Sequence, residues 1–173
     1  MPIVNNDTAP HPVTEPESVH LSEGKHGPFE VVVRSGSATF IVDEPFGAGG
    51  LGAGPTPFDL LSAALGACAL MTMRLYASGL GWPVEHIVVR VSHLREGLKD
   101  RDRFVEEIQL VGDLTEAQRQ ALAEVATRCP IHLTVARGSD IEICLLKVGE
   151  VAEGAVSRTA HVRRMREAIR GLV

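Results

Sequence analysis

The stretch TPFDLLSAALGACALMTMRLYASG, residues 56–79, decides the fold. Thr56 is a good N-cap, and Asp59 completes a capping-box pattern near the positive end of the helix dipole. The proline between them suits the first helical position, because its missing N–H costs nothing there. Gly79 then ends the helix. We therefore predict one long helix over this stretch.

The middle of this helix is apolar on nearly every face, as in helices that are surrounded by protein. Asp59 and Arg74 bracket 14 uncharged residues, whereas a bilayer requires roughly 20 apolar residues. The pattern thus predicts a buried core helix and no membrane span. Cys68 lies at its middle.

Composition narrows the class of protein. The chain has 173 residues, 45% of them hydrophobic, which suggests one domain with appendages and a core that needs no disulfides. A net charge of −5 without a basic run argues against nucleic acid or a membrane as partner. Three scattered cysteines and the lack of a signal-peptide pattern make the cytoplasm the expected location.

The chain divides into three parts. Residues 1–18 contain several prolines and no apolar periodicity, so we expect a mobile arm. Residues 19–148 form the main domain. In residues 149–173, apolar side chains fall on one stripe with arginines around it, which predicts an amphipathic helix that docks on the domain or on a second chain.

Alternating apolar residues and turn signals place the other elements of the domain. We expect two strand hairpins, a second helix capped by Asp113 or Thr115, and a last strand over 140–148; the hairpins cover 29–34 with 38–42 and 84–94 with 104–111. This order predicts an α+β fold with antiparallel sheets packed against the central helix.

The glycine-rich segment 45–55 precedes the central helix. A phosphate-binding loop is one interpretation, but no Lys followed by Ser or Thr opens the helix, and no βαβ unit surrounds the segment. We favour a flexible connector.

Cys68 has apolar neighbours along its helix face, and burial there would raise the pKa of its thiol and leave it unreactive. A reactive Cys68 needs a positively charged neighbour. The candidates, each of which also has a purely structural interpretation, are Arg34, His93, Arg128 and His132.

Cys129 precedes a proline, which disfavours the α conformation and makes Cys129 the expected N-cap of a short helix. Free N–H groups at such a terminus favour a thiolate. The two cysteines could form a peroxidatic and resolving pair. A zinc site from Cys68, His93, Cys129 and His132 is a weaker alternative, because only the last two are closely spaced.

Two motifs carry a family resemblance: the segment from Gly54 to Ala77 that contains Cys68, followed by Gly-Trp-Pro, and the later Arg-Cys-Pro-Ile-His over 128–132. Together they resemble the OsmC/Ohr family, in its OsmC-like branch, over about residues 20–146. The resemblance implies antiparallel sheets wrapped around the central helix and an intertwined homodimer with active sites at the interface. It also implies thiol-dependent reduction of organic hydroperoxides in oxidative stress defence.

In the scheme that the resemblance implies, Cys68 attacks the peroxide and becomes a sulfenic acid, and Cys129 resolves it as a disulfide. An external dithiol, such as a lipoyl protein, regenerates the pair without a cofactor or metal. The family holds its thiolate with an arginine from the N-terminal hairpin, for which Arg34 is the candidate here. Arg128 and His132 are secondary candidates.

The chain departs from the family at one position. The family's glutamate lies ten residues before the reactive cysteine, and Phe58 occupies that place here. Asp59 follows, but it lies half a turn out of phase with Cys68 and about 13.5 Å away along the axis, so it can only orient an arginine or cap the helix. Two alternatives to a peroxidase therefore stay open. One is a protein that binds a thiol partner or exchanges disulfides with it, and the other is an inert scaffold.

Overall fold

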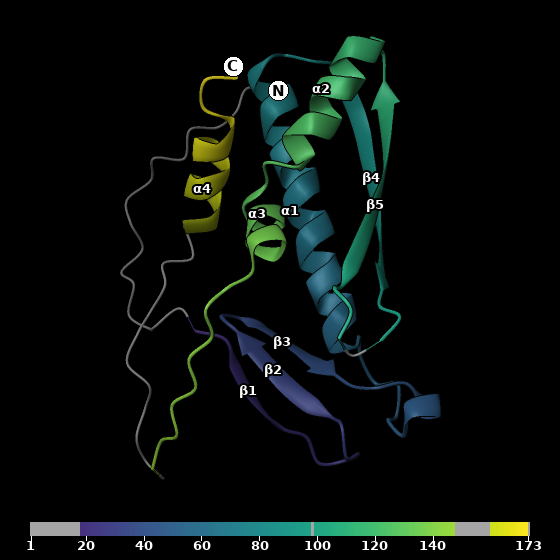
Figure 1. Cartoon of the computed structure of the whole chain (residues 1–173), viewed down its shortest axis with the longest axis vertical. Helices are drawn as coiled ribbons and strands as arrows, with labels where there is room; N and C mark the ends of the chain where they lie inside the picture. Colours follow the sequence, from purple (N-terminus) through teal and green to yellow (C-terminus); the bar gives the residue numbers. More distant parts are fainter. Residues whose placement is uncertain (1–17, 98, 148–159, 173) are drawn as a thin grey trace.

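The computed structural model describes residues 18–97, 99–147 and 160–172 (Figure 1). It confirms the α+β class: a central helix, α1 (Pro57–Gly79), lies against a two-stranded antiparallel sheet, and a separate three-stranded antiparallel sheet precedes it in the chain. The predicted arm, residues 1–18, lies almost wholly outside the described residues.

The start of α1 is the predicted capping box. The Thr56 side chain accepts the N–H of Asp59, and the Asp59 carboxylate accepts the N–H of Thr56 at 2.9 Å. Asp59 therefore acts as a helix cap. In the described residues, α1 is the one helix that is long and apolar enough to cross a membrane. The core helix of a soluble protein meets the same criterion of length and composition. The buried residues of α1, Cys68, Ala69 and Met73 among them, belong to the core.

The first sheet has the order β1 (His20–Glu23), β2 (Val31–Ser35) and β3 (Ala38–Val42). The β2–β3 hairpin is the one expected from sequence, and its turn contains Gly36 with φ 59°. In Figure 1 this sheet lies below the end of α1 at which the helix begins.

The second sheet pairs β4 (Val84–Leu94) with β5 (Arg103–Gly112), as predicted. It covers one side of α1; α2 (Glu116–Ala126), α3 (Pro130–Arg137) and α4 (Ala160–Ile169) also contact α1, and α3 and α4 lie on the side away from the sheet in Figure 1. The cap of α2 is Thr115, which settles the choice between the two caps predicted from sequence. The functional residues of α1 thus lie between a sheet and a layer of short helices.

The glycine-rich connector has a defined conformation, with a short 3-10 helix over Phe46–Ala48. The buried Asp43 carboxylate accepts the N–H groups of Glu44, Leu51 and Ala53. Burial favours the protonated acid, but these donors together hold the pKa of Asp43 below its usual range. The segment is tied to the end of β3 by these bonds, so it is more ordered than the flexible connector we expected.

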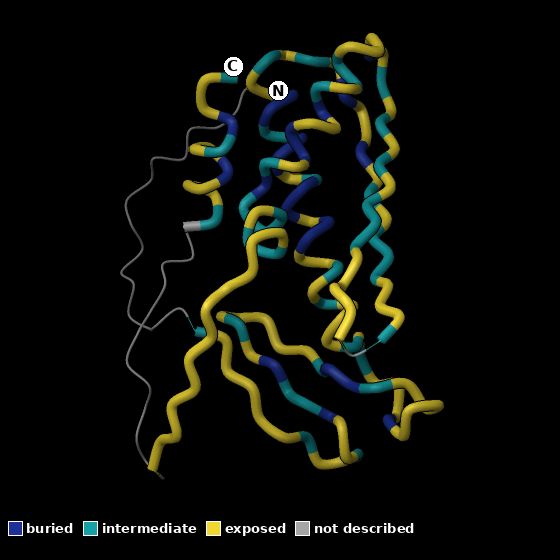
Figure 2. The backbone as a smooth tube through the Cα atoms, viewed as in Figure 1, coloured by how far each residue is buried: buried dark blue, intermediate teal, exposed yellow. Residues whose placement is uncertain are grey.

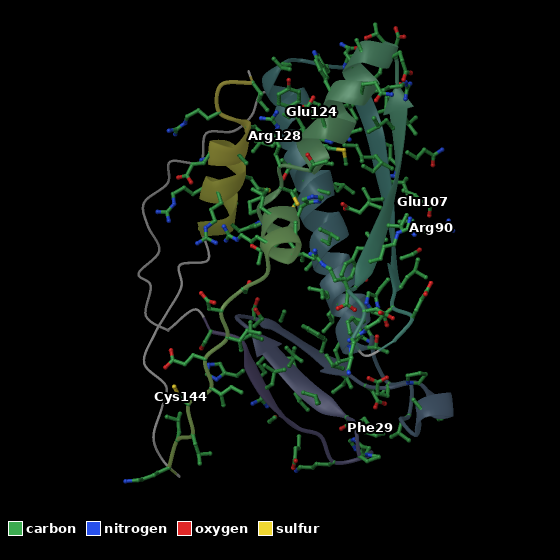
Figure 3. All side chains as sticks on the ribbon, in the orientation of Figure 1. Phe29, Arg90, Glu107, Glu124, Arg128 and Cys144 are labelled. Atoms are coloured by element: carbon green, nitrogen blue, oxygen red, sulfur yellow. The ribbon has the colours of Figure 1, made fainter. Side chains whose placement is uncertain are left out.

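The prediction of a strand over residues 140–148 is wrong. Residues 140–147 have no secondary structure, and Ile141, Ile143 and Leu145 are 86%, 91% and 99% exposed (Figure 2). Alternating apolar residues fit a strand, but a strand also needs a neighbouring strand to pair with, and in the described residues neither sheet includes residues 140–146. Cys144 lies on this exposed segment, away from the core (Figure 3).

The amphipathic helix expected within residues 149–173 is α4. Met165 and Ile169 are buried on its inner face, and α4 contacts α1 and α3 of the same chain. Residues 148–159, which include part of the predicted stripe, lie outside the described residues.

Candidate active site

Two cysteines from distant parts of the sequence meet beside α1. Cys68 lies at the middle of that helix, and Cys129 is the N-cap of α3. The two residues are 1% and 0% exposed, and neither forms a disulfide. The side chains of these two free cysteines are hydrogen-bonded to each other.

The backbone at Cys129 explains how its sulfur is placed. Cys129 is extended, as the following proline requires, and its Sγ accepts the N–H of His132 at 3.2 Å. A cysteine thus fills the capping role that serine or aspartate plays in other helices. The same helix start points the Ile131 N–H at Cys68 Sγ, at 3.5 Å.

The surroundings of Cys68 favour its thiolate. The Cys129 thiol donates a hydrogen bond to it, and this is the largest influence on its acidity. Burial opposes ionisation, whereas the Ile131 N–H and the His161 ring favour it, and the combined effect lowers the pKa of Cys68 to about 5. His161 Nε2 lies 3.2 Å from Cys68 Sγ.

The proton shared by the cysteine pair stays on Cys129. Its hydrogen bond to the Cys68 sulfur, together with burial, raises the pKa of Cys129 above its ordinary range. These opposite shifts favour one thiolate and one thiol in the pair. An anionic sulfur beside a protonated sulfur is the arrangement that a nucleophile and its resolving partner require.

Glu106, on β5, adds a carboxyl group to the same region. Burial raises the pKa of Glu106, against the lowering influence of His132, whose Nδ1 lies 3.7 Å from Glu106 Oε2. Within the described residues, Glu106 Oε1 is buried without a hydrogen-bond partner. Sequence analysis did not find this residue, because it looks like one polar position on an alternating strand.

The predicted cationic neighbours of Cys68 lie elsewhere. Arg34 is exposed on β2, where it pairs with Thr39 across the hairpin. Arg128, just after the end of α2, forms an ion pair with Glu124 of that helix at 2.7 Å (Figure 3). Neither contributes a contact to Cys68 in the described part of the chain.

Of the predicted histidines, His132 reaches the site and His93 does not. His132 contributes its backbone N–H to Cys129. His93 binds Asp102 at 2.7 Å and stacks on Phe58 with ring centroids 4.1 Å apart. The four-residue zinc set is therefore not assembled, and the described residues contain no group of three potential metal ligands.

His161 was missed by the sequence analysis. It lies 93 residues after Cys68 in the sequence, and only the tertiary structure brings its ring to the sulfur. One available signal was its spacing, because His161, Met165 and Ile169 lie four residues apart on one face of the expected helix.

The site can carry out thiol chemistry. A buried thiolate with an adjacent thiol can reduce a peroxide through a sulfenic acid, and it can also exchange disulfides. Cys68 is only 1% exposed, so an organic substrate reaches the sulfur only after neighbouring side chains move.

Comparison with known protein families identifies one family. The family model described as OsmC-like protein matches residues 49–143, more than half of the chain. No curated protein matches the chain.

Several solved structures share the fold. An OsmC-like protein from Mycoplasma pneumoniae is 18% identical, with a TM-score of 0.60 over 71% of this chain and 89% of that one. The organic hydroperoxide resistance protein OsmC from Legionella pneumophila is 21% identical, with a TM-score of 0.54 over 68% of this chain and 87% of that one. An OsmC-like protein of unknown function from Vibrio cholerae is 14% identical, with a TM-score of 0.58 over 68% and 91%. At these identities the likeness establishes the fold.

Proposed function

Because this chain belongs to the family of OsmC-like proteins, we propose that it is a cysteine-dependent peroxidase that reduces organic hydroperoxides in oxidative stress defence. The observation that carries the proposal is the buried contact between Cys68 and Cys129, in which the Cys129 hydrogen bond lowers the pKa of Cys68. The name of the Legionella pneumophila relative, an organic hydroperoxide resistance protein, supports the choice of substrate.

In the first step, the Cys68 thiolate attacks the outer oxygen of the hydroperoxide. A sulfur–oxygen bond forms, the O–O bond breaks, and the leaving alkoxide takes a proton to become an alcohol. Sulfur is oxidised to the sulfenic acid and the peroxide is reduced.

In the second step, Cys129 attacks the Cys68 sulfenic acid. A disulfide forms, and the hydroxyl leaves as water with the proton from the Cys129 thiol. An external dithiol, of which a lipoyl group is one chemical type, then reduces the disulfide in two exchange steps. We place this cycle in the cytoplasm, where reduced thiols persist.

We further propose that the protein works as a homodimer. One stripe of α1 is apolar and exposed, with Ala64, Ala67 and Met71 at i, i+3 and i+7. Leu21 on the first sheet is 64% exposed, and residues 141–145 add further apolar surface. So much exposed apolar surface is typical of an interface.

The test mixes the reduced protein with an organic hydroperoxide or with hydrogen peroxide and counts free thiols over time. We expect the organic substrate to remove two thiols per chain rapidly and to yield a Cys68–Cys129 disulfide. Cys68→Ser abolishes the reaction, whereas Cys129→Ser stops it at a sulfenic acid that dimedone traps. The exposed Cys144 gives the matched control, because Cys144→Ser leaves both the rate and the product unchanged.

A different outcome separates the alternative. If thiol counts stay unchanged with peroxides but a lipoyl or other disulfide rapidly oxidises the pair, the protein is a thiol-exchange partner with little peroxidase activity. The same thiolate and neighbouring thiol would carry out that exchange.

A further inference from the structure

The C-terminal helix α4 reaches the active site. His161, in its first turn, places Nε2 3.2 Å from Cys68 Sγ. One and two turns further along the same face, Met165 and Ile169 are 5% and 8% exposed. Just beyond the helix, the Tyr76 hydroxyl of α1 donates a hydrogen bond to the Leu172 carbonyl at 3.2 Å. The imidazole is thus held by a docked helix.

This helix lies outside the segment that the chain shares with its family model. The match to the family model ends at residue 143, and α4 begins at Ala160. At the same time, Arg34 and Arg128 contribute no contact to Cys68 in the described residues. Among the described residues, the side chain that can carry positive charge to the sulfur is therefore the His161 imidazole, which comes from a part of the chain to which the family match does not extend.

We propose that α4 is an active-site element and that its His161 is a catalytic residue, whose imidazolium holds the Cys68 thiolate and then protonates the departing alkoxide. The second role rests on the proposed peroxidase function. The first holds for any reaction of this thiolate.

The proton balance supports both roles. In the resting site, Nε2–H of the imidazolium donates to the thiolate, so the ion pair holds one negative and one positive charge. When sulfur bonds to the outer peroxide oxygen, the inner oxygen leaves as an alkoxide. Nε2 then gives it the proton, and the products are the Cys68 sulfenic acid, an alcohol and a neutral imidazole.

Other titratable groups act on the same sulfur. Cys129 donates to it, and Glu106 is coupled electrostatically to both cysteines and ion-pairs with His132. Burial and the negative charge of Cys68 both favour the protonated form of Glu106, so this carboxyl group supplies no positive charge to the sulfur. On α4 itself, Arg163 faces Glu167 at 3.9 Å.

The test compares His161→Ala, which removes the ring, with His161→Gln, which keeps an N–H donor but cannot carry charge. The control is His86→Gln, which changes an exposed histidine on β4. In each reduced variant, which also carries Cys144→Ser, the thiolate midpoint is measured from the pH dependence of iodoacetamide alkylation at Cys68. The rate of organic hydroperoxide consumption is measured in the same variants.

We expect both His161 variants to raise the midpoint by about one pH unit or more, the usual effect of losing an opposite charge at this distance. At neutral pH, the peroxide reaction falls by about 100-fold, the size of a general-acid contribution. Added imidazole partly restores the His161→Ala rate, which a merely structural role of the ring would not allow. His86→Gln behaves as the unchanged protein.

The result that overturns the proposal is an unchanged alkylation midpoint in both His161 variants. A midpoint that moves with Arg34→Ala but with neither His161 variant overturns it as well and assigns the cation to the arginine. If the unchanged protein consumes no hydroperoxide, the peroxidase function and the proton-transfer role both fail. The alkylation midpoint still decides whether His161 holds the thiolate.

Discussion

At the scale of single residues, the site depends on where one proton resides. Burial alone would make both cysteines inert thiols, because an apolar environment disfavours the charged form. The Cys129 hydrogen bond, the Ile131 N–H and the His161 ring outweigh burial at Cys68, and they leave Cys129 as the protonated partner. One sulfur is thus activated by keeping the other protonated.

This proton arrangement predicts how stability depends on pH. In the unfolded chain both thiols titrate near ~8.5, whereas the pKa of Cys68 in the folded chain is about 5. Between these values Cys68 carries a proton in the unfolded chain and none in the folded chain, so this thiol makes stability rise with pH by up to about 1.4 kcal/mol per pH unit. Above the pKa of an unfolded thiol, the raised pKa of Cys129 makes stability fall as pH rises.

The measurement is urea unfolding under a non-thiol reductant at several pH values, for the unchanged protein and for Cys68→Ser. We expect the unchanged protein to gain stability relative to the variant as pH rises from about 5 to about 8. Parallel pH curves for the two proteins would mean that Cys68 is not an anion in the folded state.

At the scale of elements, local signals predicted what local chemistry determines. The capping box of α1, the cap at Thr115 and the turn before Pro130 are each encoded within a few residues, and the structure has all three. The two hairpins followed from alternation and turn residues. Local signals could not predict the contact of His161 with Cys68, because the two residues are 93 positions apart and the contact depends on how α4 packs against the domain.

The strand that was wrongly predicted over residues 140–148 shows what hydrophobic alternation alone cannot predict. Alternation describes which faces are apolar, but it does not say what covers them. Ile143 and its neighbours are exposed in the single chain. Arg34 makes no contact with Cys68 within the single chain, since its sheet lies apart from the layer that holds the two cysteines (Figure 1), and its role stays a prediction.

The packing of α1 on β4 gives a prediction for Gly66→Ala. Glycine is a poor helix former, so on propensity alone alanine would stabilise α1 by about 1 kcal/mol. A Cβ at Gly66, however, would lie 2.8 Å from Cγ2 of Val91. Overpacking of this kind costs about 1–3 kcal/mol, so we expect a net loss of stability in urea unfolding.

A second substitution isolates the cause. Val91→Ala in the Gly66→Ala chain removes the clashing methyl groups, so the double variant should recover part of the loss. The matched control is Ala123→Gly at an exposed position of α2, which should lose only the propensity difference of about 1 kcal/mol. If Gly66→Ala stabilises the protein, helix and sheet are less closely packed than the structure shows.

At the scale of the whole molecule, the core is unevenly covered. The side of α1 that faces β4 and the short helices is buried, whereas the first sheet and residues 139–147 are largely exposed (Figure 2). A hollow lined by Ala63, Gly66 and Ala67 lies on the outer face of α1 beside β4. These surfaces are suited to burial against a second copy of the chain.

The proposed homodimer can be tested through these surfaces. We expect light scattering to give twice the chain mass of 18.5 kDa. Met71→Lys, at a side chain that is 50% exposed on α1, places a charge in the apolar stripe and should shift the protein towards the monomer, as should Ile143→Asp.

The control is Val88→Lys, on the β4 face that carries the exposed Arg90–Glu107 ion pair (Figure 3). This control should leave the mass unchanged, because the charge enters a surface that is already polar. A monomeric unchanged protein would contradict the dimer, and the contacts between Cys68, Cys129 and His161, which all lie within one chain, would then constitute the whole active site.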